Sequence, residues 1–210
     1  MVVPLQNRVD PFGSIRRDAA RGLFTGNRGV IHDPATRTLL PRRWTTKAWI
    51  VCTLVHPRGV TRAPMGRNAP SGGAGWTELF FLDEVTALAA GHRPCFYCRR
   101  EAAEDFRRRF ATGNGLGHAS APAMDALLHR QRPASGGAPP LLAPEAVMAL
   151  PDGAMIAFGG QAYAIRGAEA LPWHFSGYGA AAPLPRGPVR LLTPPATVAA
   201  LRAGYRPAWG

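Results

Sequence analysis

The chain has 210 residues, of which 46% are hydrophobic, which is enough for one full core or two small domains. It carries 25 Lys and Arg residues against 13 Asp and Glu, a formal net charge of +12, and no apolar run long enough to cross a bilayer. These properties exclude a membrane-spanning protein. Residues 1–10 lack the apolar segment of a secretory signal, so we expect a cytoplasmic protein with reduced thiols.

The positive charge is almost entirely arginine, because Lys47 is the only lysine. The planar fork of arginine suits phosphate and guanine, so the composition predicts a nucleic-acid partner, with DNA expected first. A high-GC genome would also favour arginine over lysine. That bias does not by itself explain the shortage of carboxylates.

The first third of the chain is broken into short elements by glycine and proline, with a turn predicted at residues 26–29. The aromatic and β-branched residues 48–55 predict a buried strand that presents Cys52. Residues 57–75 are rich in Gly, Pro, Arg and Asn with almost nothing to bury, so we expect an exposed, mobile basic loop.

Residues 76–82 form a second apolar run, after which Asp83 is the expected N-cap of a helix that ends at Gly91. A further helix is predicted from Arg99 to Phe110 and a short amphipathic one over residues 123–132. The second of these places Asp125 and His129 four residues apart on one face, either as a surface pair, which we favour, or as a group that orients an imidazole.

The Gly- and Pro-rich residues 133–144 are the predicted boundary between two segments, 1–132 and 145–210. In the second segment Gly159 and Gly160 predict a hairpin between strands 154–158 and 161–165. Further strands are expected at 173–178 and 189–192, with a closing helix that ends at Gly204. The predicted fold class is therefore α+β: a small zinc-stabilised N-terminal α/β module, then a β-rich segment with a closing helix.

The chemistry-bearing residues lie in two short clusters, Cys52-x3-His56 and Cys95-x2-Cys98. Four such ligands in two pairs are typical of a structural zinc site, and the odd number of cysteines argues against a disulfide framework. The fourth ligand is the open point. His56 has the expected spacing, whereas His92 and His32 are the alternatives. A redox pair at C-x2-C and three cysteines buried as small apolar residues are the competing interpretations.

Residues 84–99, a helix ending in Ala-Gly followed by His-Arg-Pro-Cys-Phe-Tyr-Cys-Arg, resemble the second half of the zinc module of the bacterial Ada family, which repairs methylphosphotriesters in DNA. The resemblance extends over about residues 48–100. It implies zinc ligands at Cys52, Cys95 and Cys98, with His56 in place of a fourth cysteine, and it implies that Cys52 is the methyl acceptor. The loop between the clusters is longer than in that family, and a neutral histidine makes the site less negative.

Three classes of function remain. The first is a zinc-stabilised protein of DNA repair or processing that contacts phosphates through arginines near the cysteine turn, namely Arg93, Arg99, Arg100, Arg107 and Arg108. The second is an enzyme, with Cys52 as acceptor or with Asp125 and His129 in a metal-assisted hydrolase. The third is a structural or adaptor protein that binds an acidic partner.

Overall fold

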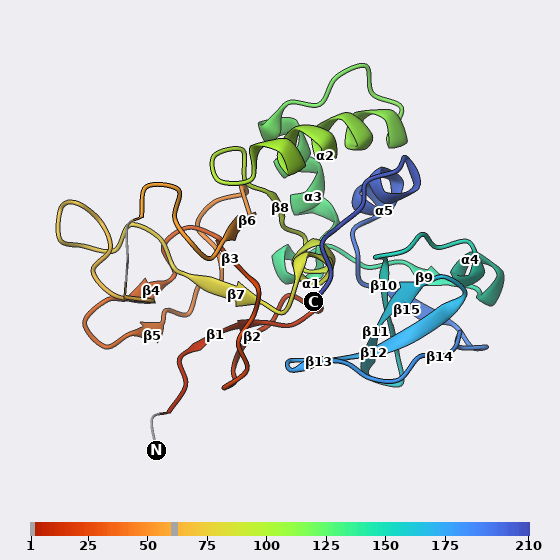
Figure 1. Cartoon of the computed structure of the whole chain (residues 1–210), viewed down its shortest axis with the longest axis horizontal. Helices are drawn as coiled ribbons and strands as arrows, with labels where there is room; N and C mark the ends of the chain where they lie inside the picture. Colours follow the sequence, from red (N-terminus) through yellow and green to blue (C-terminus); the bar gives the residue numbers. More distant parts are fainter. Residues whose placement is uncertain (1–2, 60–62) are drawn as a thin grey trace.

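The computed structural model describes residues 3–59 and 63–210, and it has the α+β fold that the sequence predicts (Figure 1). Two sheets lie on either side of a short central helix, α1 (Glu84–Ala89). Three helices pack against one another beside the sheets: α2 (Arg100–Gly113), α3 (Ala121–Gln131) and α5 (Pro195–Arg202). A short α4 (Pro144–Met148) precedes the second sheet.

The first sheet has six strands in the order β2-β1-β7-β3-β6-β8. Most neighbours are antiparallel, but β1 pairs with β7 and β6 pairs with β8 in parallel. Its strands are β1 (Gln6–Val9), β2 (Ile15–Arg17), β3 (Phe24–Asn27), β6 (Ile50–Thr53), β7 (Leu79–Phe81) and β8 (Arg93–Pro94). A separate two-stranded ribbon consists of β4 (His32–Asp33) and β5 (Thr38–Leu39).

The second sheet is antiparallel throughout its main path, β13-β12-β11-β10-β15-β9, and β14 adds to β12. Its strands are β9 (Leu141–Leu142), β10 (Met155–Phe158), β11 (Gln161–Arg166), β12 (Glu169–His174), β13 (Gly177–Tyr178), β14 (Ala182–Pro183) and β15 (Val189–Leu191). The predicted hairpin is confirmed, because Phe158 pairs with Gln161 and both intervening glycines have positive φ.

The predicted ends of α1 are also confirmed. The Asp83 carboxylate accepts the Thr86 backbone N–H at 2.8 Å, and Gly91 has φ of +82° just after the helix. This stop fixes the direction of the chain as it enters β8, two residues before Cys95.

One local prediction was wrong. Residues 173–178 are not one strand but the adjoining parts of β12 and β13, which turn at Phe175 and Ser176. Residues 133–144 contain a 3-10 turn (Pro133–Ser135) and β9. The described residues of the 57–75 loop are exposed or partly exposed, as predicted, except Met65, which is buried and whose N–H donates to the Glu78 carboxylate. Residues 60–62 of that loop lie outside the described residues.

One hydrophobic cluster joins the two predicted segments. Phe106, Phe110 and Leu128 pack in the same cluster as Ile156 and Leu201. Segments 1–132 and 145–210 therefore share this cluster, while a second cluster lies within the first segment alone. No helix in the described part of the chain has the length and apolar character that crossing a membrane requires.

Candidate metal centre

The pairing of β6 with β8 brings the first two cysteines together. In the parallel register Ile50 lies opposite Arg93 and Val51 lies opposite Pro94. The Cys95 N–H donates to the Val51 carbonyl at 3.0 Å, which extends the ladder by one residue. Cys52 in β6 and Cys95 directly after β8 therefore lie opposite one another, although 43 positions separate them in the sequence.

Cys98 joins them through a tight turn between β8 and α2. The Arg99 N–H closes this turn on the Cys95 carbonyl at 3.0 Å, and the Tyr97 N–H donates to the Cys95 sulfur at 3.4 Å. The sulfur atoms of Cys52, Cys95 and Cys98 lie within 4.8 Å of one another, a group we call the cysteine cluster. Zinc-bound thiolates sit about 2.3 Å from the metal, which separates two sulfurs of a tetrahedral site by about 3.8 Å. Small side-chain adjustments therefore suffice for all three to bind one ion.

The thiols of the cysteine cluster differ in pKa. The pKa of the Cys95 thiol is lowered, because the Cys52 and then the Cys98 thiol hydrogen-bond to its sulfur. The pKa of the Cys52 thiol is raised, chiefly by the same hydrogen bond to Cys95 and by that to Cys98. The cluster thus stabilises a thiolate at its centre, and a thiolate is the form that binds metal.

The three histidines considered as the fourth metal ligand lie in different environments. His56 lies outside the cysteine cluster, with its Nδ1 accepting the Arg58 N–H at 3.2 Å and its ring 5.9 Å from that of Tyr97. His32 is bound at both ring nitrogens, to Thr77 and to the Gly66 carbonyl. His92 is fully buried between Trp49 and Phe81. Of the three, His56 alone shares a cavity with the cysteines.

That cavity, the thiol pocket, has a volume of about 580 Å³, and all three cysteines and His56 line it. Its apolar wall includes Phe80, Trp76 and Tyr97, and Arg58 is a basic residue among the described lining residues. Glu78 holds the 63–76 loop against the pocket, because its carboxylate accepts the Met65 N–H and the Asn68 side-chain N–H. A ligand at the cysteine cluster would therefore face a volume of small-molecule size.

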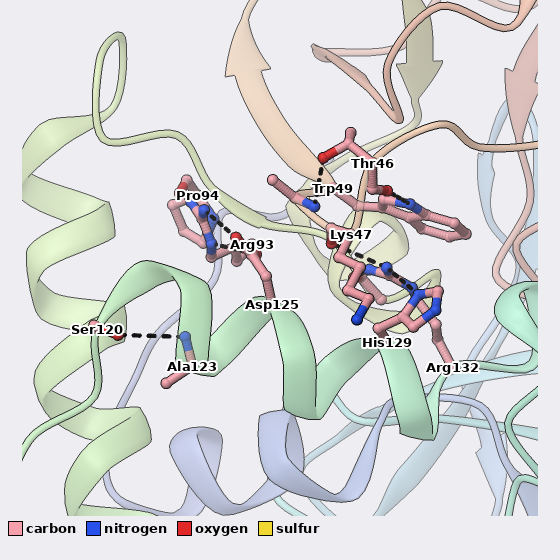
Figure 2. Close-up of polar contacts among 12 residues, drawn as sticks. Thr46, Lys47, Trp49, Arg93, Pro94, Ser120, Ala123, Asp125, His129 and Arg132 are labelled. Atoms are coloured by element: carbon pink, nitrogen blue, oxygen red, sulfur yellow. Dashed lines mark hydrogen bonds and ion pairs between the residues drawn. The ribbon is translucent and has the colours of Figure 1, made fainter.

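Two of the arginines proposed as phosphate contacts are engaged elsewhere. Arg93 donates two hydrogen bonds of 2.8 Å to the Asp125 carboxylate, and both side chains are buried (Figure 2). Arg99 makes the same bidentate contact with Glu84. The guanidinium groups are neutralised inside the protein, so they support the cysteine turn and do not face solvent.

The three α2 arginines proposed as phosphate contacts are exposed or partly exposed, namely Arg100, Arg107 and Arg108. Arg100 is exposed, Arg108 pairs with Asp105 three residues earlier, and Arg107 pairs with Glu104. Exposed pairs of this kind contribute little to stability and are readily exchanged for another anion.

Asp125 and His129 do not act on each other. Asp125 is turned toward Arg93, whereas the His129 Nδ1 lies 3.1 Å from the Arg132 guanidinium (Figure 2). The His129 ring also packs on Trp44. The two residues therefore offer no oriented imidazole for hydrolysis. The favoured interpretation of a surface pair was also wrong, because Asp125 is buried and bound to Arg93.

Sequence reasoning did not find Glu84 and Glu78 as supports of the site. Both acids lie within or beside the apolar stretch 76–90, and both are buried. A carboxylate inside an apolar run is a usable signal, since buried acids almost always have a partner.

Comparison of the chain with protein-family models, curated proteins and solved structures finds no match. The resemblance to the Ada zinc module therefore stays a prediction that depends on the residues quoted for it.

Proposed function

We propose that this protein binds zinc at the cysteine cluster and that the bound metal faces the thiol pocket. The observation that carries the proposal is the convergence of three sulfurs within 4.8 Å, fixed by the β6–β8 register and by the turn before α2. A soft, thiolate-rich donor set favours zinc over oxygen-binding ions such as magnesium or calcium.

His56 is the proposed fourth ligand. It lines the same pocket as the cysteines, and it follows Cys52 by four residues in a half-exposed segment that carries no helix or strand. Its Nδ1 is occupied by the Arg58 N–H, so Nε2 is the nitrogen available for metal. When bound, zinc would hold the thiols deprotonated and would fix the two strands and the turn to one another.

The test is elemental analysis of the full chain purified without chelator, with one zinc per chain expected. Cys95→Ser should abolish stoichiometric zinc. His56→Ala should weaken zinc binding by at least about tenfold, whereas His174→Ala, a change of the same kind outside the thiol pocket, should leave it unaltered. Absence of metal, or equal affinity in the His56 and His174 variants, would remove the site or its fourth ligand.

We further propose Cys52 as the reactive ligand. The Cys95 sulfur accepts the Tyr97 backbone N–H at 3.4 Å, and the backbone amides of Cys98 and Thr53 act to lower the pKa of Cys95 and of Cys98 respectively. No backbone N–H donor to the Cys52 sulfur is found among the described residues. Hydrogen bonds to a thiolate stabilise its charge and lower its nucleophilicity, so when zinc holds all three cysteines as thiolates, Cys52 is the proposed nucleophile.

The reaction implied by the resemblance is methyl transfer from a DNA methylphosphotriester. The Cys52 sulfur would form a bond to the methyl carbon, the bond from that carbon to the phosphate oxygen would break, and the phosphodiester would leave as an anion. Incubation with methylphosphotriester DNA, followed by peptide mass spectrometry, should place one methyl group on Cys52. Methylation spread equally over Cys95 and Cys98, or absent, contradicts the transfer while leaving zinc binding intact.

DNA binding itself is proposed from the net charge of +12 and from the exposed arginines of α2. Affinity for duplex DNA should fall with salt by about 0.9 log unit per contacted phosphate for each tenfold rise in salt. The double variant Arg100→Gln/Arg108→Gln should flatten that slope by about two contacts. The matched double variant Arg186→Gln/Arg190→Gln, on exposed residues of the second segment, should not. If neither DNA nor RNA binds at low salt, the acidic protein partner becomes the better interpretation.

A further inference from the structure

A second cavity lies where the two sheets meet, away from the cysteine cluster. It has a volume of about 420 Å³ and is formed on one side by residues around β2 and on the other by the start of β11 and the turn after β12. None of the thiol-pocket residues contributes to it. We call it the aromatic pocket, because Phe12, Trp173 and Phe175 line it.

The aromatic rings are held in place. The Trp173 and Phe175 rings meet edge to face with centroids 4.7 Å apart. The Trp173 indole N–H donates to the Thr86 hydroxyl at 2.9 Å, which orients that ring. Phe175 occupies the short turn between β12 and β13, so its position is set by the Trp173–Tyr178 and His174–Gly177 pairs on either side. Fixed rings offer their electron-rich faces to a cation at little entropic cost.

The charged side chains of the aromatic pocket are acidic. Asp10 and Asp18 line it, and none of the 25 Lys and Arg residues of the chain is among the lining residues that the structure describes. Asp10 is buried and accepts the Ser14 N–H at 2.8 Å, with Arg16 at 3.3 Å from outside the pocket. Asp18 accepts the Ala20 N–H through one oxygen. In a chain of net charge +12, this local acidity selects a positively charged ligand.

We propose that the aromatic pocket binds a small organic ammonium ion. Aromatic faces next to carboxylates are the combination that recognises such ions, because the ring quadrupole and the negative charge act on a ligand that also has apolar surface. A bare metal ion does not fit: the cysteine cluster is the only close group of three or more metal-ligand side chains in the described part of the chain. The cavity is of the size that takes a small molecule.

The test titrates the full chain with choline while ¹H–¹⁵N NMR spectra follow the Trp173 indole N–H. The neutral isostere 3,3-dimethylbutan-1-ol has the same shape without the charge. Choline should bind with a Kd of about 1 mM or below, and the alcohol at least roughly tenfold more weakly. Equal binding of the two compounds, or no shift at roughly 50 mM choline, overturns the proposal.

Variants separate the rings from the charge. Phe175→Ala should weaken choline binding by about fivefold to thirtyfold, and Asp18→Asn by about threefold. Phe158→Ala and Asp152→Asn make the same changes at exposed residues outside the pocket and should keep the full affinity. Loss of affinity in the control variants as large as in the pocket variants would contradict the site. Because Asp18 is a partly exposed surface residue, its variant keeps the test decisive if Phe175→Ala fails to fold.

Discussion

His92 illustrates how the core fixes the protonation state of a residue that sequence reasoning considered as a ligand. Its ring packs against Trp49 and Phe81, and its Nε2 accepts the Arg28 guanidinium N–H at 3.3 Å. Burial, and then the charges of Arg28 and Arg132, hold the pKa of His92 well below its ordinary value. The imidazole is therefore neutral in the folded protein.

A pH dependence follows from that shift. As the pH falls, His92 in the unfolded chain takes up a proton at about pH 6.5, whereas His92 in the folded chain does so only at a lower pH. The unfolded state is therefore stabilised relative to the folded state below about pH 6.5. The resulting loss of stability should reach up to about 1.4 kcal/mol per pH unit. Urea unfolding between about pH 7 and pH 5.5 measures it. His92→Gln should remove this slope, His174→Gln should retain it, and equal slopes in both variants would contradict the assignment.

The Arg93–Asp125 ion pair is a second group of buried charged residues. Both side chains are buried, at 6% and 9% exposure, so removing one partner leaves an uncompensated charge. Asp125→Ala should lower the free energy of unfolding by about 3–5 kcal/mol. The double variant Arg93→Met/Asp125→Leu should recover most of that loss, because it removes both charges.

Zinc affinity should follow the same order, since Arg93 lies two residues before Cys95. Urea unfolding and zinc titration of the three proteins test both statements. A double variant no more stable than Asp125→Ala would show that the charge is not the cause.

At the scale of the elements, Gly26 controls how closely β3 approaches β6. A Cβ at this position would lie 2.1 Å from the Ile50 carbonyl oxygen and 2.9 Å from the Phe81 ring. Gly26→Ala should therefore push β3 from β6, lower the free energy of unfolding by about 1–3 kcal/mol and weaken zinc binding through Cys52. Gly73→Ala, where no atom lies within 4 Å, is the matched control and should change neither quantity in urea unfolding or zinc titration.

The elements also show what could be predicted from the sequence. Asp83, Gly91 and the Gly159–Gly160 pair are local signals, and each has the predicted structure. The Ser176-Gly177 turn signal was overlooked inside an apolar run, which merged β12 with β13. The partners of the arginines were beyond local reasoning, because Arg93 meets a carboxylate 32 residues away and Arg99 one 15 residues away.

The candidate metal site likewise has one part that could be predicted from the sequence and one part that could not. The spacing of Cys95 and Cys98 fixes a local turn, and it was readable from the sequence. The thiol pocket depends on the β6–β8 register and on the loop held by Glu78, and both are tertiary. Whether His56 reaches the metal depends on that loop geometry, so its role stays a prediction.

For the whole molecule, the buried network around Glu84 joins the cysteine turn to the C-terminal residues. Its carboxylate accepts Arg99, the Tyr205 hydroxyl at 2.6 Å and the Ala208 N–H at 2.9 Å. The chain end lies beside α1, between the two sheets (Figure 1). The second segment therefore supports the cysteine turn through Glu84, although it contributes no cysteine.

Shared packing of this kind predicts that the two segments unfold together. Leu201 of α5 is 1% exposed and packs in the same cluster as Phe106 and Phe110 of α2. Leu201→Ala should lower the free energy of unfolding by about 2–5 kcal/mol. Hydrogen exchange followed by mass spectrometry should register the same loss in peptides from β3 and β6 as in peptides from β10 and β11, because one cooperative transition exposes both. Met148→Ala, on an exposed residue of α4, should change neither. Faster exchange confined to the second sheet would show that the segments are energetically independent, and that the cysteine cluster is stable without the support of the C-terminal half.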